Sequence, residues 1–306
     1  MYNGLIILDK PADFTSHDAV AKTRGILRQR RIGHAGTLDP LATGVLILLL
    51  GSATRASELA SGHDKEYIAA LRPGLATDTQ DISGREISRE AREVSADELR
   101  AVLPRFCGKI SQVPPMYSAV QVEGKRLYQL ARAGKNVERA ARSITIHELE
   151  LLEGRSPEGD FFLRVLCSKG TYVRTLCHDI GAALGCGGCL ASLRRTRSGS
   201  FGLERAVTFD TLAEASRRGE LAELIIPTDE LFSEYPAISV TPDGAARVKN
   251  GAFVAAGQIS SGSIPAIGGL CRVYAPDGDF LMLGRSGELE RGGEAVFGYK
   301  NFWSVE

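Results

Sequence analysis

The stretch RIGHAGTLDPLATG (residues 31–44) runs directly into VLILLL (residues 45–50), the longest aliphatic run of the chain. Its three glycines permit positive φ angles and close backbone approach, and Pro40 holds the preceding Asp39 in an extended conformation. Together the two segments predict a rigid loop that presents one carboxylate at the end of a buried strand. An elaborate turn in which Asp39 only caps backbone amides is an equal alternative.

Around this loop, strand and helix signals follow one another without a regular alternation. Strands outnumber helices, which favours an α+β fold over a doubly wound sheet. The predicted strands cover residues 5–8, 45–50, 67–71, 118–122, 144–152 and 161–167, and the predicted helices cover residues 16–30, 96–103 and 171–184.

The amino-acid composition of the chain changes after Leu231. Glycine and short β-prone runs dominate at residues 237–240, 270–275, 280–283 and 295–302, separated by turn signals such as PDGD at 276–279. We therefore expect a first domain over residues 1–230 and a small, mostly β domain over residues 235–306.

Composition excludes several classes of protein. Of the 306 residues, 43% are hydrophobic and 24% are charged, which is typical of a folded chain and not of a disordered one. No apolar run is long enough to span a membrane, and the N-terminus lacks the basic region of a signal peptide. Six irregularly spaced cysteines favour a reducing cytoplasmic setting.

Charge is balanced overall, with 37 basic and 37 acidic residues, but it is unevenly distributed. Two basic runs flank the unusual motifs. Either run alone is most simply a solvated face, whereas the two together favour a polyanionic partner such as nucleic acid. The runs consist of Lys22, Arg24, Arg28, Arg30 and Arg31, and of Arg194, Arg195 and Arg197.

Common cofactor signatures are missing. The sequence has no Walker phosphate loop, no GxGxxG after a strand and no GxSxG nucleophile elbow. Cys186 and Cys189, with Cys177 and His178 upstream, leave a zinc site open, but small buried thiols at a tight turn are the favoured interpretation. We therefore predict neither a cofactor nor a metal.

Several segments, in this order, closely resemble the TruB-type tRNA pseudouridine synthases, which isomerise the T-loop uridine at position 55. The resemblance implies a mixed, mainly antiparallel catalytic sheet and a PUA-like C-terminal RNA-binding domain. It also implies an insertion near residues 120–139 that grips the T loop. The segments are LDKP (8–11), GHAGTLDPLATG (33–44), KEY (65–67), TDTQD (77–81), PMYSA (115–119), SKGTYVRT (168–175) and LRR (193–195).

The resemblance assigns roles to individual residues. Asp39 matches the catalytic aspartate, which attacks C1′, attacks C6 or assists a glycal route; the sequence leaves these three open. Arg174 matches its ion-pair partner, and Tyr67 matches the aromatic residue that stacks on the flipped base and receives the C5 proton. The remaining matches are Tyr172 and Leu193 (pocket walls), His34 (which fills the gap in the RNA stack), and Lys10 and Asp81 (pocket support).

The implied partner is the tRNA T-stem loop. The resemblance implies a monomer that does not bind a membrane and needs neither a protein partner nor a guide RNA. Two alternatives remain: a guide-RNA-dependent relative, which shares the aspartate loop, and a non-catalytic tRNA-folding chaperone. The implied insertion and the lack of long basic extensions disfavour the first alternative. Substitution of Asp39 would distinguish catalysis from the chaperone alternative, because only catalysis requires the carboxylate.

Overall fold

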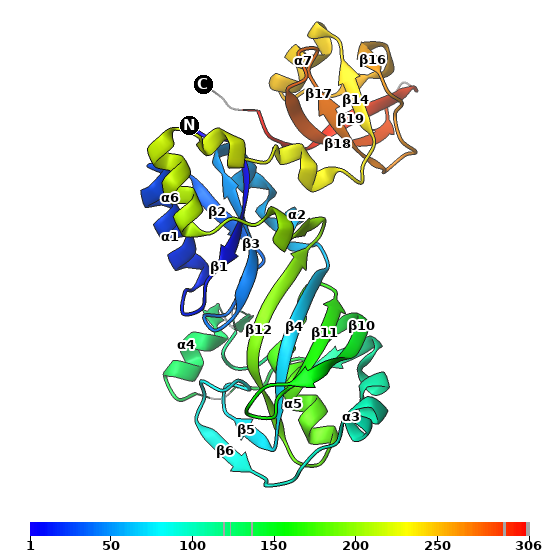
Figure 1. The fold of residues 1–306 in the computed structure, drawn as a ribbon. Helices are drawn as coiled ribbons and strands as arrows, with labels where there is room; N and C mark the ends of the chain where they lie inside the picture. The colour runs from blue at the N-terminus through cyan, green and yellow to red at the C-terminus, as the bar shows by residue number, and fades with distance from the viewer. Residues whose placement is uncertain (119, 123, 136, 290–291, 304–306) are drawn as a thin grey trace.

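The computed structural model describes residues 1–118, 120–122, 124–135, 137–289 and 292–303. Within these residues, one nine-stranded sheet and one six-stranded sheet follow each other along the chain, as Figure 1 shows. Helices do not alternate regularly with the strands. The predicted α+β class is therefore confirmed. None of the helices in the described ranges combines the length and the hydropathy needed to cross a membrane.

The large sheet is mixed and mainly antiparallel. Its order is β1-β3-β12-β4-β11-β10-β7, with β2 paired to β3 and β13 paired to β12. Among these neighbours, β3 and β12 run parallel and the other pairs run antiparallel. The strands are β1 (Gly4–Lys10), β2 (Ile32–Ala35), β3 (Thr43–Leu50), β4 (Lys65–Pro73), β7 (Gly108–Gln112), β10 (Arg142–Arg155), β11 (Phe161–Cys167), β12 (Gly188–Ser198) and β13 (Phe201–Gly202).

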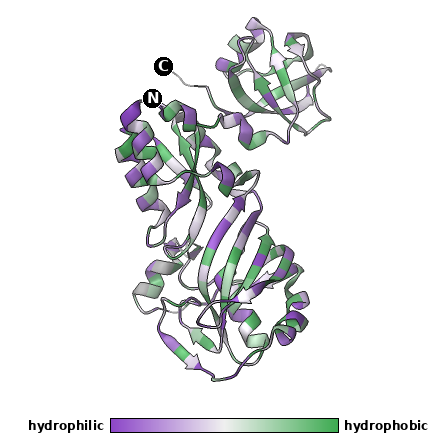
Figure 2. Ribbon diagram, in the orientation of Figure 1, coloured by the Kyte–Doolittle hydropathy of each residue, from purple (hydrophilic) through white to green (hydrophobic). Residues whose placement is uncertain are grey.

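The aliphatic run quoted above forms β3, which is buried on both faces. Leu46, Leu48 and Leu50 pack into one hydrophobic core with helices α1 (Ser16–Leu27) and α6 (Phe209–Arg218). The alternate residues of β3 pack into a second core that also contains Phe232 and Phe302. Burial on both faces explains why β3 is apolar without alternation. Figure 2 shows apolar residues along the strands and hydrophilic residues on the outer turns of the helices.

The six-stranded sheet forms the C-terminal part, in the order β15-β19-β18-β17-β14-β16. It is connected to the large sheet through the second core, where the Phe232 and Phe302 rings lie 5.5 Å apart. All four strand regions predicted in this part of the chain are present. Its elements are β14 (Ala237–Val240), α7 (Pro242–Lys249), β15 (Val254–Ala255), β16 (Ile259–Ser261), β17 (Leu270–Tyr274), β18 (Phe280–Glu288) and β19 (Glu294–Asn301).

Helix boundaries follow the capping signals. Thr15 and Asp18 form a capping box at the start of α1, which ends three residues before the predicted limit because Arg28 adopts a left-handed conformation. Ser95 and Glu98 cap α3 (Ala96–Val102) in the same way. Helix α5 (Val173–Ala183) begins two residues later than predicted, which places Arg174 in its first turn.

Two regions differ from the predictions. Of the strand predicted over 118–122, Ala119 lies outside the described residues, and the structure assigns β8 (Gln121–Val122). This strand pairs with β9 (Lys125–Arg126) and precedes α4 (Leu127–Arg132). Of the expected insertion, Glu123 and Asn136 lie outside the described residues. The second difference is β12, a long strand between β3 and β4 that contains the basic run 194–197 and that the prediction did not include.

Candidate active site

The loop between β2 and β3 holds Asp39, and contacts from α1 and β1 fix it in place. The Leu38 N–H donates to Ser16 Oγ over 2.9 Å, and Lys10 Nζ donates to the Pro40 carbonyl over 3.3 Å. Gly36 and Gly44 have φ angles of 70° and 96°, which only glycine adopts without strain. The loop is therefore held on both sides of Asp39 by residues near the N-terminus.

The carboxylate of Asp39 binds the guanidinium of Arg174. Arg174 Nε lies 2.8 Å from Oδ2 and Nη2 lies 3.3 Å from Oδ1, which is a bidentate arrangement. The side chain of Arg174 is 4% exposed, whereas that of Asp39 is 38% exposed. Asp39 therefore presents an accessible carboxylate paired with a shielded cation. This geometry contradicts the alternative in which Asp39 only caps backbone amides.

Arg174 also connects segments that are distant in sequence. Its Nη1 donates to the Thr79 carbonyl over 3.0 Å, and its Nη2 donates to the Tyr117 carbonyl over 2.8 Å. Nη1 lies 3.8 Å from the buried carboxylate of Asp81, whose other oxygen accepts a hydrogen bond from Thr79 Oγ1 over 2.8 Å. Asp81 thus supplies a second, buried carboxylate beside the Arg174 guanidinium.

A cavity of about 280 Å³ opens beside Asp39. Tyr67 on β4, Tyr172 before α5 and Leu193 on β12 line it together with Asp39 and Arg174. Its volume is close to the lower end of the range for small-molecule pockets. Five of the predicted site residues therefore meet in one cavity, although they come from different segments of the chain.

The two tyrosines of the cavity are held differently. Tyr67 is buried, and this burial raises the pKa of its phenol, whereas the nearby Arg195 cation opposes the rise. The backbone of Tyr172 is fixed by Gln112, which accepts from its N–H over 2.8 Å and donates to its carbonyl over 3.0 Å. Burial thus restrains the Tyr67 ring, and two hydrogen bonds restrain the backbone that carries Tyr172.

Lys10 lies beneath the loop and outside the cavity. It is fully buried, and its Nζ donates to the carbonyls of Pro11 and Phe14 over 2.8 and 2.6 Å in addition to that of Pro40. Burial, with a smaller contribution from Arg195, lowers the pKa of Lys10 to about 8. Lys10 therefore positions the backbone next to Asp39.

His34 lies on β2, before the loop, and is not among the residues that line the cavity. Its ring meets the His17 ring edge to face, with centroids 5.4 Å apart. Burial, followed by the neighbouring His17 and Arg195, lowers the pKa of His34 to about 4. His34 is therefore neutral near pH 7.

Two cationic residues of the cavity were missed as site residues. Lys65 is buried and its Nζ donates to the Ser61 carbonyl over 2.7 Å and to the His63 carbonyl; burial lowers its pKa to about 8. Arg195 is 1% exposed and binds backbone carbonyls. The interpretation of Arg195 as a phosphate contact is therefore wrong. Two features of the sequence could have identified these residues: the KEY motif (65–67) for Lys65, and for Arg195 the alternation of side chains between the two faces of a strand.

Other members of the basic runs are accessible. Arg28, Arg30 and Arg31 are exposed at the C-terminal end of α1. Arg194 pairs with Asp9 over 2.8 Å on the large sheet. These side chains remain compatible with contacts to phosphate.

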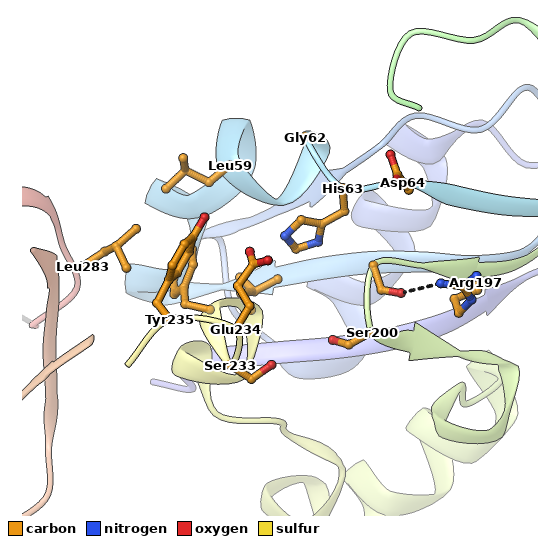
Figure 3. Close-up of a pocket in the computed structure, with 13 residues that line it drawn as sticks. Leu59, Gly62, His63, Asp64, Arg197, Ser200, Ser233, Glu234, Tyr235 and Leu283 are labelled. Carbon is orange, nitrogen blue, oxygen red and sulfur yellow. Dashed lines mark hydrogen bonds between the residues drawn. The ribbon is translucent and has the colours of Figure 1, made fainter. Parts of the chain in front are cut away.

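A second, larger cavity of about 530 Å³ is shown in Figure 3, and residues of the segment 61–65 separate it from the Asp39 cavity. Ser61 and Lys65 line the Asp39 cavity, whereas Gly62, His63 and Asp64 line this second cavity with the segment 231–235. Size therefore does not identify the site. The paired carboxylate and guanidinium with aromatic walls favour the smaller cavity.

Cys177, Cys186 and Cys189 are all buried, in agreement with the favoured interpretation of small thiols. Burial raises the pKa of Cys189 to about 11, so this thiol is protonated near pH 7. In the part of the chain that the structure describes, no three His, Cys, Asp or Glu side chains form a group that could hold a metal.

The sequence and the fold of this chain are similar to those of known proteins. A family model described as TruB family pseudouridylate synthase, N-terminal domain, matches residues 24–173. A protein from Cupriavidus metallidurans named tRNA pseudouridine synthase B is 43% identical over 290 residues, which cover 94% of this chain and 91% of that protein. The chain belongs to the TruB family. The resemblance found in the sequence is thus confirmed.

Further TruB matches extend the comparison. The model described as tRNA pseudouridylate synthase B C-terminal domain matches residues 174–233. A tRNA pseudouridine synthase B of Pseudomonas putida is 46% identical over 246 residues, covering 79% of this chain and 80% of that protein. The boundary between the two TruB models falls between Val173 and Arg174, so it crosses the cavity described above.

Solved structures show the same fold as this TruB chain. A chain of a Cbf5-Nop10-Gar1 complex has a TM-score of 0.74 at 30% identity, covering 98% of this chain and 85% of that chain. A chain of an H/ACA RNP bound to a substrate RNA containing 2′-deoxyuridine has a TM-score of 0.73 at 28% identity, with the same coverage. These matches confirm the mixed sheet of the pseudouridine synthase type.

Proposed function

We propose that this TruB-family isomerase is a tRNA pseudouridine synthase that converts the T-loop uridine at position 55. The reaction breaks the C1′–N1 bond, turns the uracil and joins C1′ to C5. The C5 proton leaves and N1 gains a proton, so that the nucleoside keeps its composition. The reaction is redox-neutral and requires neither a nucleotide nor an electron acceptor.

Asp39 is the proposed catalytic residue. Its carboxylate is accessible from the cavity, and Arg174 holds it in one orientation. The guanidinium stabilises negative charge near the reacting sugar and uracil, and its own burial keeps water from weakening the interaction. This pair at the mouth of an aromatic cavity is the observation that carries the proposal.

The substrate uridine has to leave the T loop to reach Asp39. Flipping a base costs a few kcal/mol, and stacking on an aromatic ring returns about 1–3 kcal/mol. Tyr67 supplies that ring in the proposed complex and receives the C5 proton, while Tyr172 and Leu193 enclose the base. His34, at the start of the loop, fills the gap that the base leaves, and its neutral ring suits a stack of bases.

The rest of the RNA is proposed to bind outside the cavity. Exposed arginines at the end of α1 and the half-buried Arg194 and Arg197 of β12 supply phosphate contacts. Lys125 and Lys135 supply further charge from the insertion near 120–139. We assign residues 1–230 to the catalytic domain and residues 235–306 to a PUA-like RNA-binding domain. The enzyme is proposed to act as a cytoplasmic monomer.

The solved relatives come from assemblies, whereas we propose that this chain acts without protein partners or a guide RNA. The test is to incubate the purified chain with a synthetic T-stem-loop RNA and to map pseudouridine by mass spectrometry. We expect conversion of one T-loop uridine, and none with Asp39→Asn, which should still bind the RNA within a few-fold of wild type. Binding without conversion by the wild-type protein would instead favour the chaperone alternative.

A further inference from the structure

Arg195 connects both ends of the loop that carries Asp39. Its Nε donates to the Val45 carbonyl over 2.6 Å, and its Nη2 donates to the Gly36 carbonyl over 2.8 Å. Gly36 precedes Asp39 by three residues, and Val45 follows it by six. One guanidinium therefore fixes where the loop leaves β2 and where it enters β3.

The backbone of Arg195 makes the same connection. Arg195 pairs with Gly44 in the parallel register of β12 and β3. A Cβ atom at Gly44 would lie 2.2 Å from the Arg195 carbonyl oxygen, so the two strands touch at this point. The end of the loop is therefore both packed against the Arg195 backbone, at Gly44, and hydrogen-bonded to the Arg195 side chain, at Val45.

On its other side, β12 places Arg195 opposite Tyr67 of β4. Burial raises the pKa of the Tyr67 hydroxyl. Among its neighbours, the Arg195 cation lowers this pKa, whereas Cys167 of β11 and Asp39 raise it further. Arg195 is therefore the residue that touches the Asp39 loop and also favours the ionised form of Tyr67.

A buried arginine without a carboxylate partner is costly, because the cation loses its hydration and gains only dipoles in return. None of the ion pairs within the described ranges involves Arg195. A hydrophobic side chain would fill the same space at a lower cost if packing were the only requirement. The position of the charge, between loop and tyrosine, thus points to a role in the reaction.

We propose that Arg195 is a positioning residue of the isomerisation, which fixes the carboxylate of Asp39 and the hydroxyl of Tyr67 relative to each other. This inference rests on the proposed function. Arg195 acts through these two residues and needs no contact with the uracil itself.

The test compares Arg195→Lys and Arg195→Met with the wild type, using T-stem-loop RNA tritiated at C5 of the target uridine. The single-turnover rate, the RNA Kd, the melting temperature and the pH dependence of the rate are measured. For Arg195→Met we expect a loss of about 10²-fold in rate, the size typical of a small misplacement of reacting groups, and a Kd within threefold.

The pH dependence separates positioning from folding. Because the ionised phenol of Tyr67 is the proposed acceptor of the C5 proton, the rate should rise with pH as this phenol ionises. Without the guanidinium the pKa of Tyr67 rises further, so the rise in rate should move to higher pH. Arg195→Lys keeps a cation but lacks the planar fork that reaches two carbonyls. It should lose about tenfold in rate and keep the wild-type pH dependence.

Arg72→Met is the matched control, since Arg72 lies at the opposite end of β4 and is held by Asp160 over 2.6 Å. It should lower the melting temperature without moving the pH dependence. Wild-type rates and an unmoved pH dependence in both Arg195 variants would overturn the inference while leaving the proposed function intact. Failure of the wild-type protein to release tritium would overturn the proposed function itself.

Discussion

Arg174 donates from Nε to Asp39 Oδ2 over 2.8 Å across 135 positions of sequence. The cation is buried and the carboxylate faces the cavity, so substrate can reach one partner while the other stays shielded. The same guanidinium also holds the carbonyls of Thr79 and Tyr117. Arg174 therefore joins several segments of the fold around the proposed catalytic carboxylate, and substitutions can separate the structural role from the proposed catalytic one.

Asp39→Asn and Arg174→Met should differ in stability although both abolish turnover. Arg174→Met leaves Asp81 buried without its cation and should lower the free energy of unfolding by about 3–5 kcal/mol. Asp39→Asn removes a half-exposed charge and should change it by less than about 1 kcal/mol. Urea denaturation of the three proteins measures this; equal losses of stability would contradict the division of roles.

Substitution of Tyr67 should impair turnover far more than binding. Tyr67→Phe keeps the stacking ring but lacks the hydroxyl, so we expect a turnover loss of about 10²-fold or more with an unchanged Kd. Tyr67→Leu should also keep RNA binding within a few-fold and lose turnover steeply, because the flipped base lacks its ring. Single-turnover assays with saturating enzyme separate RNA binding from the chemical conversion. Turnover by Tyr67→Phe at the wild-type rate would exclude the hydroxyl as the proton acceptor.

RNA affinity should fall as salt concentration rises. Each phosphate contact contributes about 0.9 to the slope of log K against log salt. Replacing Arg28, Arg30 and Arg31 together by Gln should therefore reduce this slope by about 2–3 if all three meet phosphate. Arg217→Gln on α6, where Arg217 pairs with Glu214, is the control and should leave the slope unchanged. An unaltered slope in the triple variant would assign the run to a solvated face.

Gly44→Ala should damage the protein more than Gly159→Ala. Both glycines have positive φ angles, 96° and 85°, so both substitutions carry a similar conformational cost of about 1–2 kcal/mol. A Cβ at Gly159 meets no atom within 4 Å, whereas one at Gly44 meets the Arg195 backbone. The excess loss of melting temperature and activity in Gly44→Ala measures the strand contact beneath the Asp39 loop. Equal losses would show that this contact can relax.

The stability of the protein should depend on His34 at acidic pH. Burial lowers the pKa of His34 from its ordinary value of 6.5 to about 4 in the folded protein. The unfolded chain therefore binds the extra proton between these values, and stability falls as pH drops from about 6.5 to 4. His34→Gln should lose less stability than wild type between pH 7 and 5. His147→Gln, at an exposed histidine paired with Asp64, should behave like wild type.

The sequence predicts the parts of this molecule whose signals are local. The capping boxes at Thr15 and Ser95 predict the starts of two helices, and the aliphatic run predicts β3, because one segment contains all the information needed. Asp39 and Arg174 were identified through motifs, although spacing alone does not show that they meet.

The role of Arg195 was not predictable in the same way. Within a run of basic residues, Arg194 and Arg195 differ only in the face of the strand from which each side chain projects. That face depends on the pairing of β12 with β3 and β4, which are far away in sequence. Lys65 was overlooked for a related reason, since its burial follows from the packing of segment 61–65.

The boundary between the two family models has a practical consequence. Asp39 and Tyr67 belong to the N-terminal match, whereas Arg174, Leu193 and Arg195 belong to the C-terminal match. A truncated protein that stops at this boundary would keep Asp39 and lose its ion-pair partner Arg174, the cavity wall at Leu193 and the hydrogen bonds of Arg195 across the loop. The two halves cannot be exchanged independently between relatives; chimeras of such enzymes should be joined after residue 230, beyond every residue that lines the cavity.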